Sequence, residues 1–302
     1  MIEYYKDSNE IYYRLICRAN EGSNDGKEIA ILQELNESGK LISVSYPMGN
    51  YHKIDIDEGI KEVFKKYPEL NPKYRFPFIE YKEEKPELRK PKEVFSKSVQ
   101  SMISLLSKDN LQNGPEYKYF DKGYFDAFMN DDGIEAEILK KISEYKDNSI
   151  LEEIFHLIQI WGGSSGRNIY LFKNKTGGKY HWQDIEKPYK ELVDACLGTT
   201  PEDEGYVKKL VEVAKTANIS ISNLGVSFIT KHIRFWLYKN FGEDALPIYD
   251  SIMAIEVMRK KEPYITDLEE YWNVMVAKAK REKIKLMPLE RQIFLYAFDT
   301  VH

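Results

Sequence analysis

Residues 218–231 have the sequence NISISNLGVSFITK, and this stretch joins two segments that have the apolar periodicity of helices. The segment before it, EDEGYVKKLVEVAKTAN at 202–218, begins with acidic residues and continues with a single apolar stripe. Acidic residues are favoured in the first turn of a helix, because they interact well with the helix dipole. The stretch therefore predicts two consecutive helices with a short connection.

The connection between these two helices suits a tight turn. We expect the first helix to end near Asn218 and the second to begin at Val226 or Ser227. Asn223 and Gly225 lie in the intervening loop ISNLG, and both residue types tolerate positive φ. The backbone N–H groups at the start of the second helix then form a phosphate site. The pattern predicts a helix–hairpin–helix, and a plain antiparallel helix pair remains open as the alternative.

The rest of the chain divides into a strand-rich part and a helical part. Short segments rich in Ile, Tyr and Val, separated by turn-like EGSNDG and NESG, predict strands at 11–17, 28–35 and 40–46. A short helix is expected at about 57–66. Helical periodicity begins near residue 94 and recurs at 95–106, 135–145, 151–161, 226–240, 251–261, 266–283 and 288–300.

We therefore predict an α+β fold in two parts. A small β-rich domain occupies residues 1–85, a charged linker with prolines occupies residues 86–94, and a helical domain occupies residues 95–302 with its hairpin near 218–231. A length of 302 residues is enough for two modest domains.

Composition excludes several classes of protein. With 42% hydrophobic and 31% charged residues the chain is typical of a globular protein, and no apolar run reaches the roughly 18 residues of a membrane span. The first residues lack the apolar segment of a signal peptide, so we expect a cytoplasmic protein without membrane association.

Cys17 and Cys196 are too few for a disulfide framework or a four-cysteine metal site. The histidines show no metal-binding spacing, and the family resemblance given below implies that no metal or organic cofactor is needed. The net charge of −5 excludes a wholly basic nucleic-acid binder but permits a local basic patch.

Two candidate functional residues follow the hairpin. Lys231 lies about one turn into the second helix, and Asp250 comes 19 residues later, directly before a new apolar periodic run. Asp250 is therefore a good N-cap candidate. Taken separately, a lysine on a helix is usually solvated and a capping aspartate is usually structural.

With these residues the chain resembles the helix–hairpin–helix DNA glycosylases, and specifically their 8-oxoguanine DNA glycosylase branch. That family has a Thr–Lys pair at the start of the helix after the hairpin, followed by a Pro-x-(x)-Asp segment whose aspartate caps the next helix. Thr230 and Lys231 match the pair, and residues 247–250 (PIYD) match the segment. The resemblance implies that Lys231 and Asp250 are catalytic. A small β-rich N-terminal domain also fits this branch.

The C-terminal sequence RQIFLYAFD resembles the final helix of the family, in which a glutamine and an aromatic residue four positions later bind the flipped base. Gln292 and Tyr296 occupy these positions, and residues at i and i+4 share one helical face. Gln can hydrogen-bond a base edge and Tyr can stack on its ring. We expect Phe235, one turn after Lys231, to form the opposite wall of this base pocket, and Phe294 to pack in the core.

The segment EEIFHLIQIWGGSSGRNIY resembles the family loop that fills the gap left by an extruded base. The resemblance implies DNA contacts by residues of this loop and of the hairpin, namely Ser164, Ser165, Arg167, Asn168, Asn223, Gly225 and Ser227. The hairpin departs from the family pattern Gly-apolar-Gly, because Ser227 replaces the second glycine and two extra residues precede Lys231.

The resemblance implies a DNA N-glycosylase with AP lyase activity that acts through a lysine Schiff base. Its partner is double-stranded DNA carrying 8-oxoguanine or another modified base, including bases of phage DNA. The alternative is a catalytically inactive DNA-binding or complex-forming protein of the same fold that serves in antiphage defence.

Overall fold

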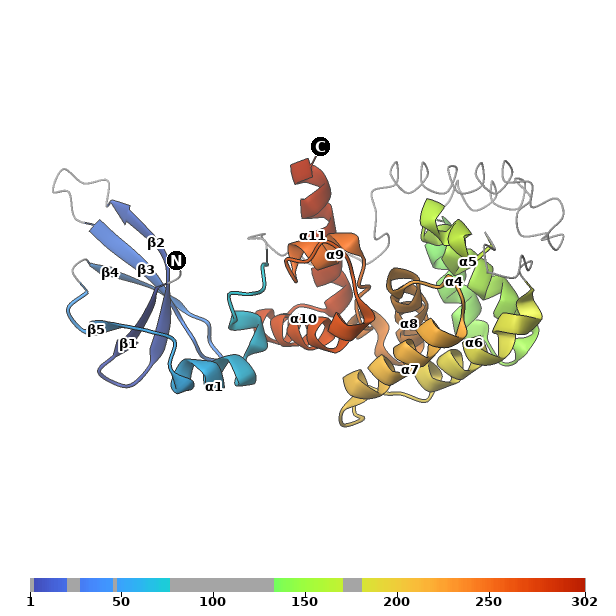
Figure 1. Cartoon of the computed structure of the whole chain (residues 1–302), viewed down its shortest axis with the longest axis horizontal. Coiled ribbons are helices and arrows are strands. Elements are labelled where there is room, and N and C mark those ends of the chain that lie inside the picture. The colour runs from blue at the N-terminus through green and yellow to red at the C-terminus, as the bar shows by residue number, and fades with distance from the viewer. Residues whose placement is uncertain (1–2, 21–27, 46–47, 77–132, 171–180, 302) are drawn as a thin grey trace. The chain divides into compact units, whose positions relative to one another are not determined.

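A computed structural model describes residues 3–20, 28–45, 48–76, 133–170 and 181–301 of the chain (Figure 1). The chain forms two compact units. The first contains residues 1–75 together with 273–283, and the second contains residues 76–272 together with 284–302. The predicted linker at residues 86–94 and the predicted helix at 95–106 lie outside the described residues.

The first unit is built on a five-stranded antiparallel sheet with the strand order β4-β3-β2-β1-β5. The three strands predicted from the sequence are confirmed as β2, β3 and β4. The sheet adds an edge strand, β5, and a first strand, β1. The bounds are β1 Tyr4–Asp7, β2 Tyr12–Asn20, β3 Glu28–Glu34, β4 Leu41–Ser45 and β5 Tyr51–Ile54.

The two faces of the sheet carry separate apolar clusters, as strand alternation requires. On one face the buried residues are Tyr5, Tyr13, Ala30, Leu32 and Met48. On the other face Tyr4 and Leu35 pack against Ile60 and Leu70. Ile60 belongs to helix α1 (Glu58–Lys66) and Leu70 to the 3₁₀ turn η1 (Pro68–Leu70).

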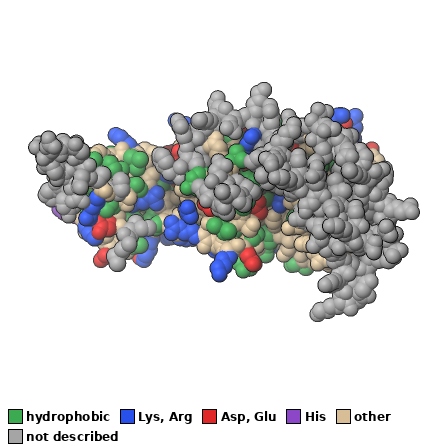
Figure 2. All heavy atoms as spheres, turned by 90° about the horizontal axis from the view of Figure 1, so that it is seen from above, with side chains coloured by type: hydrophobic (Ala, Val, Ile, Leu, Met, Phe, Trp, Pro, Cys, Tyr) green, Lys and Arg blue, Asp and Glu red, His purple; other side chains and the backbone are tan. Residues whose placement is uncertain are grey.

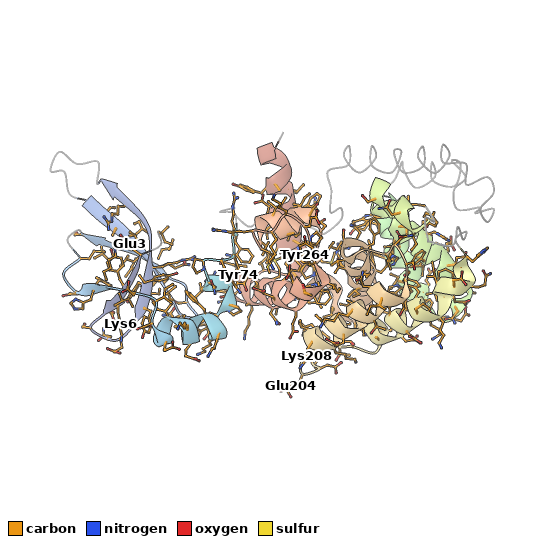
Figure 3. All side chains as sticks on the ribbon, in the orientation of Figure 1. Glu3, Lys6, Tyr74, Glu204, Lys208 and Tyr264 are labelled. Carbon is orange, nitrogen blue, oxygen red and sulfur yellow. The ribbon has the colours of Figure 1, made fainter. Side chains whose placement is uncertain are left out.

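Glu3 joins three strands through its carboxylate. It accepts hydrogen bonds from Lys53 Nζ at 2.7 Å, from Tyr5 Oη at 2.8 Å and from Arg18 Nη2 at 2.8 Å. Figure 3 labels Glu3 on this sheet. The hydrogen bond from Lys53 and then that from Tyr5 lower the pKa of Glu3 to about 2. Because this pKa is depressed in the folded state, the carboxylate keeps these partners until the pH falls to about 2.

The second unit is helical, which confirms the α+β fold. Its α-helices are α4 Gly133–Glu144, α5 Leu151–Trp161, α6 Trp182–Leu197, α7 Tyr206–Ser220, α8 Val226–Phe241, α9 Ser251–Glu256, α10 Leu268–Glu282 and α11 Leu286–Val301. Short 3₁₀ turns are η4 Asn148–Ile150, η5 Ser164–Ile169, η6 Gly242–Asp244 and η7 Ile265–Asp267. The last part of α10, from Asn273, is counted with the sheet unit.

Helix α8 is the central element of the helical unit. It contacts α4, α5, α6 and α7, of which α7 lies below it and the other three to its right in Figure 1. Every residue from Phe228 to Leu237 is buried, including Lys231, His232 and Arg234. A helix buried on all sides is normally apolar all round, so these three polar residues need partners inside the protein.

The described surface is mixed in charge. On the face shown in Figure 2, Lys and Arg side chains are interspersed with Asp and Glu side chains over the described residues. None of the helices in the described ranges is long and apolar enough to cross a membrane.

Replacing Ile60 by Ala should lower the free energy of unfolding of the sheet unit by about 2–5 kcal/mol, because Ile60 is fully buried between the sheet and α1. The matched control is Ile56→Ala, since the Ile56 side chain is 54% exposed and should cost less than about 0.5 kcal/mol. Urea denaturation followed by circular dichroism measures both changes. Equal losses from the two variants would contradict the packing of α1 on this sheet.

Candidate functional site

Helices α7 and α8 are consecutive and are joined by the short loop that the sequence predicts. Asn223 has φ of +63°, so it makes the left-handed turn that the sequence predicts there. The side chain of Asn218 closes the loop by donating a hydrogen bond from Nδ2 to the carbonyl of Leu224 at 3.2 Å. Gly225 has φ of −71° and ψ of 166°, which is extended backbone, so its tolerance of positive φ is not used here. Asn223 alone therefore supplies the unusual backbone conformation of this loop.

Gly225 is the N-cap of α8 and lies in open space. No atom lies within 4 Å of the position that a Cβ would take, and no side chain caps the helix there. Neither packing nor backbone conformation requires glycine at this position. The glycine instead leaves the first turn of α8 open to a close approach from outside.

A cavity of about 630 Å³ lies beside this helix start, within the size range of ligand sites in proteins. It is formed where the α7–α8 loop, the first turns of α8, the loop after α5, the start of α9 and α11 meet. Its lining consists of Gly162, Ser165, Asn168, Asn218, Asn223, Leu224, Gly225, Ser227, Phe228, Lys231, Asp250, Ser251, Ile252, Pro263 and Phe294. Tyr264, labelled in Figure 3, follows Pro263 in the chain and is 54% exposed.

Lys231 lies in the wall of this cavity and is only 5% exposed. Its Nζ donates a hydrogen bond to Ser227 Oγ at 2.7 Å, one turn earlier on α8. The same Nζ lies 4.4 Å from the ring centroid of Phe228. An ammonium over an aromatic face is attracted by the negative charge density of the ring. The expectation of a solvated lysine on a helix surface is therefore excluded.

Asp250 lines the same cavity and is the N-cap of α9, as the sequence predicts. Its Oδ1 accepts a hydrogen bond from the backbone N–H of Met253 at 3.0 Å. The structure thus brings Lys231 and Asp250 together, although 19 residues separate them in the chain.

The backbone that leads to Asp250 is buried and belongs to no helix or sheet, so side chains satisfy its polar groups. Trp272 Nε1 donates to the carbonyl of Pro247 at 2.8 Å, and Tyr271 Oη donates to the carbonyl of Ile248 at 2.7 Å. The N–H of Ile248 donates to Glu290 Oε1 at 2.7 Å. Helices α10 and α11 thereby fix the path of this segment.

Thr230 links the same segment directly to α8. Its hydroxyl accepts a hydrogen bond from the N–H of Tyr249 at 3.0 Å and donates to the carbonyl of Val226. Thr230 immediately precedes Lys231, and Tyr249 immediately precedes Asp250. One hydrogen bond between the two preceding residues therefore sets the positions of the candidate catalytic residues relative to each other.

Arg234, one turn beyond Lys231, is held by two buried carboxylates. Its Nη2 lies 3.1 Å from Glu135 Oε1 on α4, and its Nε lies 3.5 Å from Glu290 Oε2 on α11. All three side chains are at most 3% exposed. Because a buried charge is costly without its partner, this cluster ties α4, α8 and α11 together.

His232, the residue that follows Lys231 on α8, is fully buried. Its Nδ1 lies 2.8 Å from Tyr189 Oη, its Nε2 lies 2.9 Å from Gln159 Nε2, and its ring stacks on Phe155. Burial, and then the positive charge of Lys231, lower the pKa of His232 well below its ordinary value. His232 is therefore neutral near pH 7 and adds no positive charge beside Lys231.

The loop after α5 packs on Phe228 through two glycines. A Cβ on Gly162 would lie 2.2 Å from Cε1 of the Phe228 ring, and a Cβ on Gly166 would lie 2.1 Å from the carbonyl oxygen of Gln159. Larger residues at either position would push the loop away from α8. Ser165 and Asn168 of this loop line the cavity, whereas the side chains of Ser164 and Arg167 lie outside the described residues.

The predicted base-pocket residues are placed differently from the expectation. Phe235 is fully buried, with its ring edge-on to Trp161 at 5.0 Å between centroids, so it is a core residue and not a wall of the cavity. Among the residues that the structure describes, the cavity lining includes Phe294 of α11 but neither Gln292 nor Tyr296. Residues two positions apart point about 200° apart on a helix, so Phe294 faces away from the side shared by Gln292 and Tyr296.

Two aromatic residues of the cavity were missed by sequence reasoning. Phe228 lies three residues before Lys231, and this spacing on a helix is a signal for contact. Phe294 was expected in the core, and it is indeed only 3% exposed, but its remaining surface faces the cavity.

Replacing Thr230 by Val should lower the free energy of unfolding by about 1–3 kcal/mol, because the buried N–H of Tyr249 loses its acceptor. Thr230→Ser keeps the hydroxyl and should lose much less. Chemical denaturation of both variants measures the difference. Equal stability of Thr230→Val and Thr230→Ser would show that this hydrogen bond does not hold the segment before Asp250.

No protein-family model, curated protein or solved structure matches the chain. The chemistry of the cavity is therefore inferred from its own residues. These are a buried lysine and a helix-capping carboxylate, surrounded by amide and hydroxyl side chains and bordered by two aromatic rings.

Proposed function

We propose that this protein is a DNA N-glycosylase with AP lyase activity. The observation that carries the proposal is the meeting of Lys231 and Asp250 in one cavity at the start of the helix that follows the hairpin. A nucleophilic lysine needs a partly desolvated environment, and Lys231 is only 5% exposed. The substrate is double-stranded DNA with a modified base, either 8-oxoguanine or another modification such as those of phage DNA.

The cavity lining supports binding of an extruded nucleotide. Glycosidic bonds are unreachable inside the base stack, so an enzyme of this kind moves its target nucleotide into a pocket. Three asparagines and three serines offer donors and acceptors for base edges and for the sugar–phosphate backbone, namely Asn168, Asn218, Asn223, Ser165, Ser227 and Ser251. The rings of Phe228 and Phe294 offer apolar surface on which a base can pack.

The chemistry follows from the two ionisable side chains. Neutral Lys231 Nζ attacks C1′, a new C–N bond forms, and the glycosidic bond breaks so that the base leaves with the bonding electron pair. The amine then loses a proton, and the carboxylate of Asp250 in the same cavity is its acceptor and stabilises the positive charge on the sugar. The C1′–O4′ bond then breaks, O4′ takes up the proton held by Asp250, and the nitrogen lone pair forms the C=N bond of a Schiff base. The Schiff base acidifies the C2′ proton and permits elimination of the 3′ phosphate.

The hairpin supports contact with a DNA phosphate. The first turn of α8 is not capped by a side chain, and its N–H groups favour an anion. The open space at Gly225 permits the close approach that such a contact needs.

Lys231→Gln should abolish borohydride trapping of a protein–DNA adduct and release of the base, because the Schiff base needs the lysine amine. Asp250→Asn should keep the cap of α9, since Asn caps a helix about as well as Asp, but should slow base release by about 100-fold or more. Single-turnover assays on duplexes with different modified bases measure both effects.

The control for these variants is binding to an uncleavable duplex, which both should retain. Base release that is undiminished in Lys231→Gln would contradict the assignment of the nucleophile. Binding of modified duplexes by the wild-type protein without any trapping would favour the alternative function, that of a DNA-binding protein without catalysis.

Gly225→Ala should weaken DNA binding severalfold while leaving the melting temperature unchanged, because the added methyl group meets no protein atom and occupies the space before the α8 N–H groups. Gly49→Ala is the matched control, since a Cβ there also meets nothing within 4 Å and the residue lies in the sheet unit. Fluorescence anisotropy with a labelled duplex measures binding. Unchanged affinity of Gly225→Ala would mean that no phosphate approaches this turn.

A further inference from the structure

Phe228 contacts both the candidate nucleophile and the loop after α5. One contact is the Lys231 ammonium, 4.4 Å from its ring centroid. The other is the backbone of Gly162, which comes so close that a methyl group there would overlap the ring at 2.2 Å. The ring is only 7% exposed, so its position is fixed by this packing.

We propose that Phe228 is the positioning residue for Lys231, and that its ring face, together with the Ser227 hydroxyl, holds the protonated amine at the cavity wall until a substrate is bound. The proposal rests on the proposed function, in which Lys231 is the nucleophile. Phe228 lies in the insertion by which this hairpin departs from the glycosylase pattern, so its role follows from this structure and not from the resemblance.

The direction of the effect follows from the two contacts. A ring face attracts an ammonium but not a neutral amine, and a hydroxyl oxygen accepts a hydrogen bond from an ammonium. Both contacts therefore favour the protonated form of Lys231. Attack on C1′ needs the neutral form, so the proton must leave before the amine turns from the ring to the sugar.

Other charged and titratable groups lie on the described elements that are packed around α8. Asp250 faces the same cavity and also favours the ammonium, and His232 is neutral through burial. Glu135 of α4 and Glu290 of α11 pair with Arg234. His156 of α5 contacts Tyr170, and Tyr189 of α6 contacts His232. The residues that α7 buries are apolar. Asp244 of η6, beyond the end of α8, pairs with Lys285. Replacement of Phe228 or Ser227 therefore removes a contact of Lys231 without removing a charge.

The test measures the protonation of Lys231 directly in the full-length protein without DNA. Formaldehyde and borohydride methylate neutral lysine amines, and peptide mass spectrometry follows the rate at Lys231 as a function of pH. We expect Phe228→Leu to move the midpoint of this pH profile downward by about half a unit, which corresponds to about threefold more neutral amine at a given pH. Ser227→Ala should shift the midpoint in the same direction.

Two further variants separate a specific effect from a general loss of packing. Gly162→Ala should displace the ring without altering Lys231 or Ser227, so it should lower the midpoint in the wild-type background but not in the Phe228→Leu background. Phe64→Leu, which removes a half-buried ring from the sheet unit, should leave the profile of Lys231 unchanged.

An unchanged midpoint in folded Phe228→Leu protein, with native near-ultraviolet circular dichroism, would overturn the proposal. An equal shift in Phe64→Leu would also overturn it. A shift confined to Phe228→Leu, Ser227→Ala and Gly162→Ala supports it. If the shift occurs but wild-type protein traps no DNA, the positioning of Lys231 stands and the glycosylase function fails.

Discussion

The buried backbone from Pro247 to Tyr249 is the constraint on which the candidate site depends. This segment lies in the interior without belonging to a helix or a sheet, and unpaired peptide groups there would each cost free energy comparable to a lost hydrogen bond. Side chains from three helices supply the partners: Thr230 from α8, Tyr271 and Trp272 from α10, and Glu290 from α11. Because these partners come from separate elements, the segment has one position, and Asp250 at its end is placed at the cavity.

The same constraint explains why α8 carries polar residues in the core. Thr230 must be buried to meet Tyr249, and Arg234 must be buried to hold Glu290, which in turn accepts from Ile248. Removal of one member leaves another group unpaired, so the cluster behaves as a unit and resists substitution more than its individual hydrogen bonds suggest. Lys231 lies between Thr230 and Arg234 in the chain, so the contacts of these two residues fix its position on α8.

The sequence predicted the elements better than it predicted the cavity. Periodicity located the strands from residues 11 to 46, the hairpin and the helices around it, because burial on one face leaves a pattern in the chain. The cap at Asp250 was predictable from its place before an apolar run. The contact of Phe228 with Lys231 and the place of Phe294 in the cavity lining were not predicted, and Phe235 was expected in the pocket wall but is buried in the core, since each depends on which side of a helix meets a distant segment. The need for glycine in the loop after α5 becomes apparent only from the packing of Phe228 against that loop.

The three buried ionisable side chains of α8 have different contacts. Those of Lys231 are the ones that suit the nucleophile of the proposed reaction. Arg234 faces two buried carboxylates, those of Glu135 and Glu290. His232 is enclosed by Tyr189, Gln159 and Phe155, and burial keeps it neutral. Lys231 donates a hydrogen bond to a hydroxyl, lies over a ring face and lines the cavity. In the proposed reaction Lys231 changes from an ammonium to a nucleophile, and a neutral hydroxyl and a ring face are contacts that its amine can leave during that change.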